Sequence, residues 1–154
     1  MKSRDNADGQ PVTRRVGYLL KRAQHALRGG IDGALREFDV NLGQYAVLEA
    51  LAEHERTAMS NADLARRCFV KPQTANQLVS ALIERGAVEK RDDAFAGRAI
   101  GLALTPGGRR LLLKTRALVN GVESKMLSEL SEFERERLAH ALAQCAKALE
   151  KPGT

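Results

Sequence analysis

The sequence contains no tryptophan, and aromatic residues make up only 4% of its 154 residues. A core without many large rings must be built from aliphatic side chains, and apolar residues supply 44% of the chain. Leucine and alanine, which are frequent in that set, are strong helix formers. The length suits one domain with a core of ordinary size. The composition therefore predicts a mainly α-helical protein.

Cysteine and long hydrophobic runs are also scarce. The two cysteines, Cys68 and Cys145, are far apart and lack the spacing of metal ligands. The polar start M-K-S-R-D-N-A-D-G-Q contains no secretory hydrophobic segment, and no run is long enough to span a bilayer. We therefore expect no metal, no cofactor and no membrane contact, and a reduced, cytoplasmic setting in which both thiols stay free.

The sequence also lacks the residue patterns of catalytic sites. The histidines His25, His54 and His140 are scattered, and none has a nucleophile or an acid at motif spacing. The Gly107-Gly108 pair lacks the lysine of a phosphate-binding loop. An enzyme is thus a competing class that the sequence disfavours, and we predict no catalytic residue.

The charge is positive, with a formal net charge of +6 and a pI of about 9.7. A basic protein is attracted to polyanions such as nucleic acid, but solubility alone explains such a charge equally well. The central part of the chain is nearly balanced, with seven basic and five acidic side chains between Ser60 and Arg98. Charge therefore supports nucleic-acid binding without establishing it.

Helix signals follow one another along the chain. Apolar residues recur at three- and four-residue steps over residues 13–38, which predicts a long amphipathic helix. Gly29, Gly30 and Gly33 within it indicate either a bend or a close approach to another backbone. Further helices are expected over residues 42–54, from Ser60, from Pro72 to Gly86, after Thr105-Pro106 and from Ser131.

A short hairpin is predicted after the fourth of these helices. Val88 and residues 100–104 have the character of short strands, and the turn between them surrounds Gly97. Two short helices followed by a charged hairpin predict a winged helix-turn-helix over about residues 42–105. The expected fold class is thus mainly α with a small β-hairpin wing, a winged helix-turn-helix with added dimerisation helices.

The helix that starts at Pro72 has two distinct faces. Ala75, Leu78, Val79 and Leu82 share one face and are predicted to be buried. The opposite face is polar and uncharged, which favours base recognition over simple solvation. Asn and Gln amides can bond N6 and N7 of adenine in the major groove, and Thr can add a hydroxyl or methyl contact. The predicted base contacts are Gln73, Thr74, Asn76 and Gln77.

Other side chains suit the DNA backbone. Ser60, Lys71, Ser80 and Arg91 are the predicted phosphate contacts, with Asp92 or Asp93 as alternative partners for Arg91. Arg98 follows a glycine at the hairpin turn, where a long cationic side chain could enter a narrow minor groove.

The helices at the two ends, about residues 13–38 and 106–150, carry more apolar surface than a compact winged unit can cover. A homodimer with interleaved terminal helices would bury it, and the alternative is a monomer whose terminal helices pack on each other. Residues 1–11 are expected to form a disordered tail, which leaves residues 12–154 as a single domain.

Three segments together resemble the MarR family of bacterial winged-helix transcriptional regulators. They are L-G-Q-Y-A-V-L-E-A-L, L-A-R-R-C-F-V-K-P-Q-T-A-N-Q-L-V-S-A-L-I-E-R-G-A-V-E-K-R and G-R-A-I-G-L-A-L-T, and the resemblance extends from about Val16 to Leu149. It implies a homodimer that binds a palindromic double-stranded DNA operator, with half-sites about one helical turn (roughly 34–36 Å) apart. It also implies a repressor that a small aromatic or phenolic ligand releases from DNA.

The resemblance places the ligand site between the dimerisation helices and the winged unit. The candidate residues near it are Tyr18, His25, Tyr45 and Phe69, with simple core packing as the alternative for Tyr45 and Phe69. Cys68 stands where the family usually has an apolar residue and is interpreted as a buried structural thiol, with redox sensing as the alternative.

Two positions depart from the family pattern. Ala96 stands where an Asp commonly helps to fix the wing arginine, and Gln77 stands where an Arg is usual. These departures keep open an alternative function, a winged-helix protein-interaction or ligand-sensing module with weak or lost DNA binding. Salt dependence separates the two, because DNA binding weakens steeply as salt rises.

Overall fold

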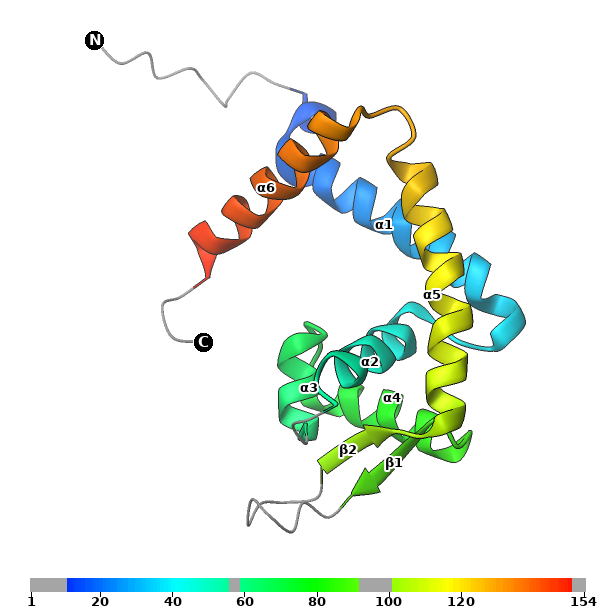
Figure 1. The fold of residues 1–154 in the computed structure, drawn as a ribbon. Helices are drawn as coiled ribbons and strands as arrows, with labels where there is room; N and C mark the ends of the chain where they lie inside the picture. The colour runs from blue at the N-terminus through cyan, green and yellow to red at the C-terminus, as the bar shows by residue number, and fades with distance from the viewer. Residues whose placement is uncertain (1–10, 56–58, 92–100, 151–154) are drawn as a thin grey trace.

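The computed structural model describes residues 11–55, 59–91 and 101–150 (Figure 1). It confirms the predicted fold class, with six helices and one two-stranded antiparallel sheet in those ranges. The helices are α1 (Val16–Leu35), α2 (Leu42–Glu53), α3 (Asn61–Arg67), α4 (Pro72–Glu84), α5 (Pro106–Met126) and α6 (Glu132–Leu149), and the strands are β1 (Val88–Arg91) and β2 (Gly101–Leu104). The predicted tail, except Pro11, and the hairpin turn with Gly97 and Arg98 lie outside the described residues.

Side-chain caps set the helix boundaries where the sequence predicted them. The Ser60 hydroxyl accepts a hydrogen bond from the Asp63 amide (3.1 Å), and the Asp63 carboxylate accepts one from the Ser60 amide (3.1 Å). Ser131 and Glu134 form the same reciprocal box at the start of α6. Thr105 caps α5 by accepting from the amide three residues on. Each cap satisfies amides that a helix start would otherwise leave free.

The first helix is shorter than the predicted span of residues 13–38. Arg15 is extended (ψ 136°) and separates a short 3-10 turn, Val12–Arg14, from α1. A second 3-10 turn, Arg36–Phe38, follows the end of α1. The glycines do not interrupt α1, and a Cβ at Gly30 would lie 3.0 Å from Val122 of α5. Gly30 therefore makes room for a side chain of α5, whereas the predicted close approach was to another backbone.

The hairpin is anchored to the helices at its base. β1 and β2 pair from Val88 opposite Leu104 to Arg91 opposite Gly101. The amide of Leu102 also donates to the carbonyl of Met59 (3.0 Å), so the chain just before α3 forms a bridge with β2. The strands therefore hold a fixed position relative to the start of α3.

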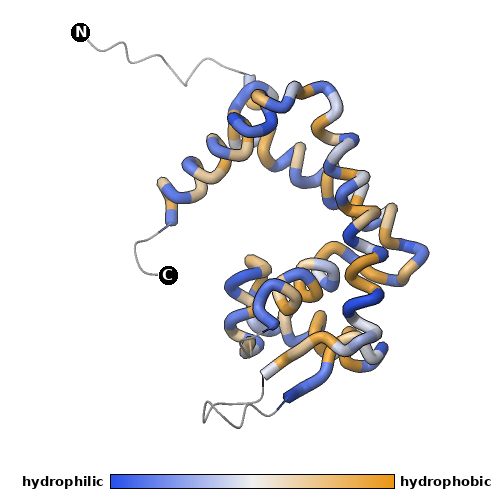
Figure 2. The backbone as a smooth tube through the Cα atoms, viewed as in Figure 1, coloured by the Kyte–Doolittle hydropathy of each residue, from blue (hydrophilic) through white to orange (hydrophobic). Residues whose placement is uncertain are grey.

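One core joins the winged unit, which we define as α2 to β2, to α5 and the end of α1. Its fully buried side chains come from α1, α2, α3, α4, β1 and α5, and Figure 2 shows the apolar stretches of these elements facing one another. They are Leu35, Val47, Leu48, Leu64, Leu82, Val88 and Thr115. The core therefore fixes the orientation of α4 within the protomer.

Helix α6 and the first half of α1 contribute nothing to that core. No residue of α6 is buried, and residues 11–26 are all exposed. Figure 1 shows α6 apart from the winged unit, beginning beyond the end of α5 that is far from that unit. These segments nevertheless carry large apolar side chains, including Val16, Leu19, Leu20, Phe133, Leu138, Leu142 and Leu149. None of the helices in the described ranges has the length and apolar character needed to cross a membrane.

Candidate nucleic-acid interface

The two faces of α4 lie as the periodicity predicted. Ala75, Val79 and Leu82 are buried, and Leu78 is half-buried against α2, where a Cβ at Gly43 would lie 3.1 Å from its methyl groups. The opposite face is exposed along its length. It presents Gln73, Thr74, Asn76, Gln77 and Ser80, which include all four predicted base contacts. A polar, uncharged surface is thus held on a helix whose other face is locked into the core.

The N-terminus of α4 has no side-chain cap. Its N-cap residue is Lys71, and the first helical residue is Pro72, which has no amide hydrogen. Helices α2, α3, α5 and α6 all have a side-chain cap. The Asn61 side-chain amide donates to the carbonyl of Pro72 (3.2 Å) and ties the starts of α3 and α4 together. An uncapped N-terminus beside a lysine is an electrostatically favourable place for a phosphate.

A cavity of about 470 Å³ separates α4 from the hairpin. Asn76 and Ser80 of α4 line it together with Asn61 of α3 and Lys90 of β1. The Asn61 side-chain oxygen is buried there and has no hydrogen-bond partner among the described residues. The concavity therefore places two polar residues of α4 opposite a cation of the hairpin.

Most arginines of the winged unit are engaged within the protein. Arg66 pairs with Asp63, and Arg67 pairs with Glu53 (2.8 Å). Arg85 donates to the carbonyls of residues 38 and 39, at 2.8 and 2.7 Å, and so ties the end of α4 to the chain between α1 and α2. These guanidinium groups therefore stabilise the fold, and a ligand that bound them would have to compete with those contacts.

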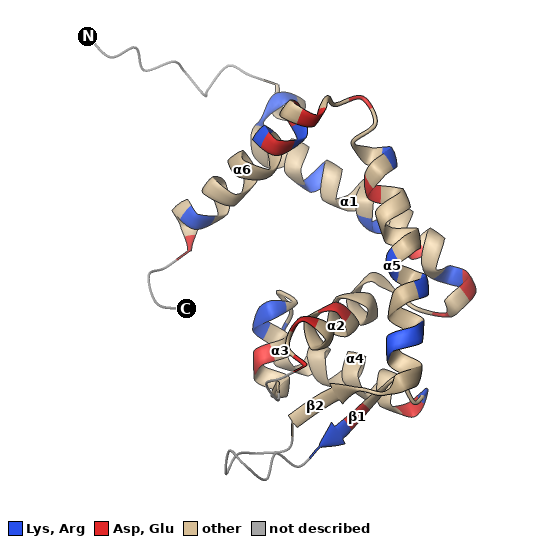
Figure 3. Ribbon diagram, in the orientation of Figure 1, with Lys and Arg blue, Asp and Glu red and all other residues tan. Residues whose placement is uncertain are grey.

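The predicted phosphate contacts differ in how free they are. Arg91 pairs with Glu89 of its own strand (2.8 Å), whereas Asp92 and Asp93 lie outside the described ranges. Ser60 donates its hydroxyl to the Asp63 carboxylate (2.7 Å), and Ser80 is exposed. Of the basic side chains described between residues 59 and 91, those of Lys71 and Lys90 make no ion pair or hydrogen bond, and Figure 3 shows the basic tip of β1.

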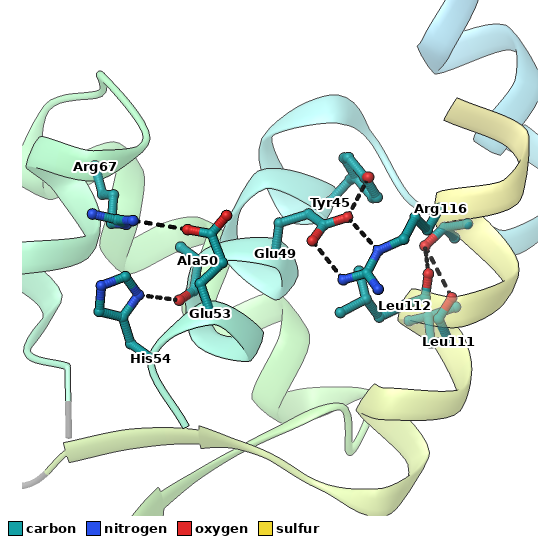
Figure 4. A network of polar contacts seen from close by, with 10 residues as sticks. Tyr45, Glu49, Ala50, Glu53, His54, Arg67, Leu111, Leu112 and Arg116 are labelled. Carbon is teal, nitrogen blue, oxygen red and sulfur yellow. Dashed lines mark hydrogen bonds and ion pairs between the residues drawn. The ribbon is translucent and has the colours of Figure 1, made fainter. Parts of the chain in front are cut away.

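A polar network joins the winged unit to α5 (Figure 4). Arg116 of α5 grips the Glu49 carboxylate of α2 with two hydrogen bonds, at 2.8 and 2.7 Å, and the Tyr45 hydroxyl donates to the same carboxylate. The hydrogen bond from Arg116 holds the pKa of Glu49 below its ordinary value, and the same contact raises the pKa of Arg116. Burial and the contact with Glu49 raise the pKa of Tyr45. Sequence analysis missed this network because Glu49 and Arg116 lie 67 positions apart.

The four candidate ligand residues are not gathered at one place within the protomer. Tyr18 and His25 are exposed on α1, Tyr45 is only 9% exposed in the core, and Phe69 is 91% exposed in the turn between α3 and α4. The described cavity beside α4 includes none of them. The ligand site therefore stays a prediction.

The Cys68 thiol, next to that turn, is half-buried, and burial raises its pKa while Arg67 opposes the shift. A raised pKa disfavours the thiolate, which is the reactive form. Cys68 is thus less buried than expected, and its structural role stays a prediction.

Known proteins share this architecture. The MarR family pattern matches residues 38–99. The HTH-type transcriptional repressor Rv2887 of Mycobacterium tuberculosis is 31% identical over 134 residues, which cover 84% of this chain and 92% of the relative. The crystal structure of the M. tuberculosis MarR family protein Rv2887 with salicylic acid is 28% identical and superposes with a TM-score of 0.71, covering 91% of this chain and 99% of that one. The complex of the same protein with DNA is 27% identical, with a TM-score of 0.70 and coverages of 85% and 97%. The chain belongs to the MarR family.

Proposed function

We propose that this chain is a homodimeric transcriptional repressor that binds a palindromic double-stranded DNA operator and is released by a small aromatic ligand. The observation that carries the proposal is the exposed, uncharged polar face of α4, held rigid by a buried apolar face. Side chains of that type hydrogen-bond to base edges, whereas a merely solvated helix face would carry mostly charges. A regulator of this kind works on the chromosome in the cytoplasm and needs no catalytic residue.

The phosphate contacts divide between free and engaged groups. Lys71 beside the uncapped start of α4 and Lys90 on β1 are available to an incoming backbone. Arg91 must leave Glu89, or share it, to reach a phosphate. We assign Arg98 to the minor groove on its position after Gly97. Because several arginines are paired within the protein, the net positive charge alone did not indicate which side chains are available to bind DNA.

The second copy is required by the exposed apolar surface of α1 and α6. Leu138 and Leu142 are exposed at 39% and 41%, and Phe133 at 65%, on a helix that buries no residue within its own protomer. Packing these side chains against a partner removes that surface from water and sets two α4 helices at a fixed separation. Two-fold symmetry of the protein then demands an inverted repeat in the DNA.

The effector is proposed from the relatives rather than from a cavity. Rv2887 crystallised with salicylic acid, and we propose a carboxylated or phenolic aromatic effector for this chain. Tyr18 and His25 are exposed on the dimerisation helix α1 and are the better placed candidates. The Tyr45 hydroxyl already donates to Glu49, so an effector that uses Tyr45 must break that contact.

The test is a selection of random duplexes with the purified protein, followed by binding at two salt concentrations with and without salicylate. We expect an inverted repeat with one-turn half-site spacing, affinity that falls steeply with salt, and release by the aromatic acid. A folded dimer that enriches no motif, or that binds with little salt dependence, would favour a protein-binding winged helix instead.

Substitutions on α4 sharpen that test. Asn76→Ala or Gln77→Ala should cost about 1–3 kcal/mol of discrimination at one or two operator positions while leaving the dimer intact. Gln144→Ala, an exposed amide on α6, is the matched control and should leave base preference unchanged. Unaltered selectivity in both α4 variants would remove these residues from the base contacts.

A further inference from the structure

The helix α3 ends in a Schellman motif with a phenylalanine where glycine is favoured. The amide of Val70 donates to the carbonyl of Ala65 (3.0 Å), and the amide of Phe69 donates to that of Arg66 (3.3 Å). In this motif the residue after the C-cap adopts the left-handed conformation, which suits glycine because it has no Cβ. Phe69 occupies that position with φ 53°.

Two other helix ends in the chain use the same backbone pattern with suitable residues. Gly86 follows α4, with φ 76° and its amide bonded to the Ile83 carbonyl (2.9 Å). Asp39 follows the 3-10 turn at the end of α1, with φ 52° and its amide bonded to the Arg36 carbonyl (3.0 Å). Glycine and aspartate tolerate the left-handed region, whereas it is strained for a bulky side chain such as Phe69.

Packing against the described residues does not offset that strain. The Phe69 side chain is 91% exposed, so it gains almost nothing from burial and leaves an aromatic ring in water. A disfavoured backbone with an exposed apolar ring indicates a contact made outside the protomer.

The position of the ring points to DNA. Phe69 stands two residues before Lys71 in the turn of the helix-turn-helix, and the exposed Gln73 and Thr74 follow in the first turn of α4. In this motif the N-terminal residues of the second helix contact base edges in the major groove. The turn belongs to none of the helices α1, α5 and α6, on which the apolar surface for a second copy lies.

We propose that Phe69 is a specificity-determining residue whose ring contacts the C5-methyl group of a thymine at the edge of each half-site. The thymine methyl is the apolar group that base pairs present in the major groove, and phenylalanine is one of the side chains that contact it. This inference rests on the proposed function, because it needs the protein to bind a duplex. It removes Phe69 from the effector site and adds an apolar contact to the polar face of α4.

The test combines protein variants with modified DNA. Each thymine of the selected operator is replaced in turn by deoxyuridine, which removes the methyl group and keeps the base pairing. We expect one replacement in each half-site to weaken wild-type binding by about fivefold, the loss that corresponds to roughly one buried methyl group. Phe69→Gly should weaken binding to the unmodified operator by a similar factor and should be insensitive to that replacement.

Stability measurements distinguish this role from a structural one. Phe69→Gly should leave the dimer intact and leave the melting temperature unchanged or raised, because glycine relieves the left-handed strain. Asp39→Gly, the matched change at another left-handed helix end, should leave operator affinity and the deoxyuridine response as in the wild type.

The remaining outcomes overturn either the proposed function or the inference about Phe69. If the wild type enriches no duplex, the proposed function fails. If the operator is bound but Phe69→Gly keeps the full deoxyuridine response, or weakens the dimer, only the inference about Phe69 fails. Equal weakening on every sequence, with no deoxyuridine effect in the wild type, would also overturn the thymine contact.

Discussion

Helices α4 and α6 are both amphipathic, yet they stand in opposite situations. The apolar face of α4 is sealed within the protomer, where Ala75 and Leu82 have no exposed surface. The apolar face of α6 is open, and Leu142 is 41% exposed. The winged unit therefore buries its apolar surface within the protomer, whereas the apolar faces of the terminal helices can be buried only against another molecule. The difference shows that recognition and assembly are built on separate parts of the chain, which α5 connects.

The largest expected effect comes from a substitution at the contact between the winged unit and α5, which connects the two regions. A Cβ at Gly108 would lie 2.0 Å from the carbonyl oxygen of Ala87, which is backbone and cannot swing aside. Gly108→Ala should lower the free energy of unfolding by about 3 kcal/mol or more. Urea unfolding followed by circular dichroism measures this.

The neighbouring glycine provides the control for that prediction. A Cβ at Gly107 would make only ordinary contacts, the nearest at 3.6 Å. Gly107→Ala should be neutral or stabilising by up to about 1 kcal/mol, since alanine is the better helix former. Equal effects of the two substitutions would contradict the close approach at Gly108.

The assembly side of the comparison is tested on α6. Leu142→Asp places a carboxylate in the open apolar face and should weaken the dimer by about 2 kcal/mol, or roughly thirtyfold in its dissociation constant. Analytical ultracentrifugation measures the dissociation, and circular dichroism checks that the winged unit stays folded. Gln144→Asp, on the other side of the same helix, should leave the dimer unchanged. A dimer that tolerates Leu142→Asp would show that α6 is not at the interface.

Local signals in the sequence were enough to predict most of the fold. Ser60, Thr105 and Ser131 cap helices through hydrogen bonds to amides three residues on, so their effect is visible in a short window of sequence. The exposed face of α4 followed from helical periodicity in the same way. Gly86, with φ 76°, ends α4 as expected.

The features that sequence could not give depend on tertiary structure. Arg85 bonds carbonyls 46 and 47 positions away, and nothing in the sequence distinguishes it from the arginines that face solvent. Arg91 pairs with Glu89 of its own strand, a partner that the sequence did not indicate, and its phosphate contact stays a prediction. The left-handed backbone of Phe69 could not be predicted, because the glycine that usually marks such a helix end is absent.

The smallest predicted effect concerns the polar joint between the two regions, the pair of Glu49 and Arg116. The side chains are 26% and 40% exposed, so Glu49→Gln should cost about 1 kcal/mol at neutral pH, a value reduced by solvent screening. The folded protein holds the pKa of Glu49 below its ordinary value, so its contribution is present above the unfolded pKa of about 4.3 and is lost as pH falls through the folded pKa. Unfolding free energies measured from pH 7 down to pH 3 should therefore fall less steeply in Glu49→Gln than in the wild type.

Glu53→Gln, which removes a more exposed pair with Arg67 on the same helix, should cost less than about 0.5 kcal/mol. If the two variants follow the same pH profile, the Glu49–Arg116 pair is no stronger than a surface ion pair, and the orientation of the winged unit on α5 rests on the other contacts between them, which include the pair of Glu55 and Arg109.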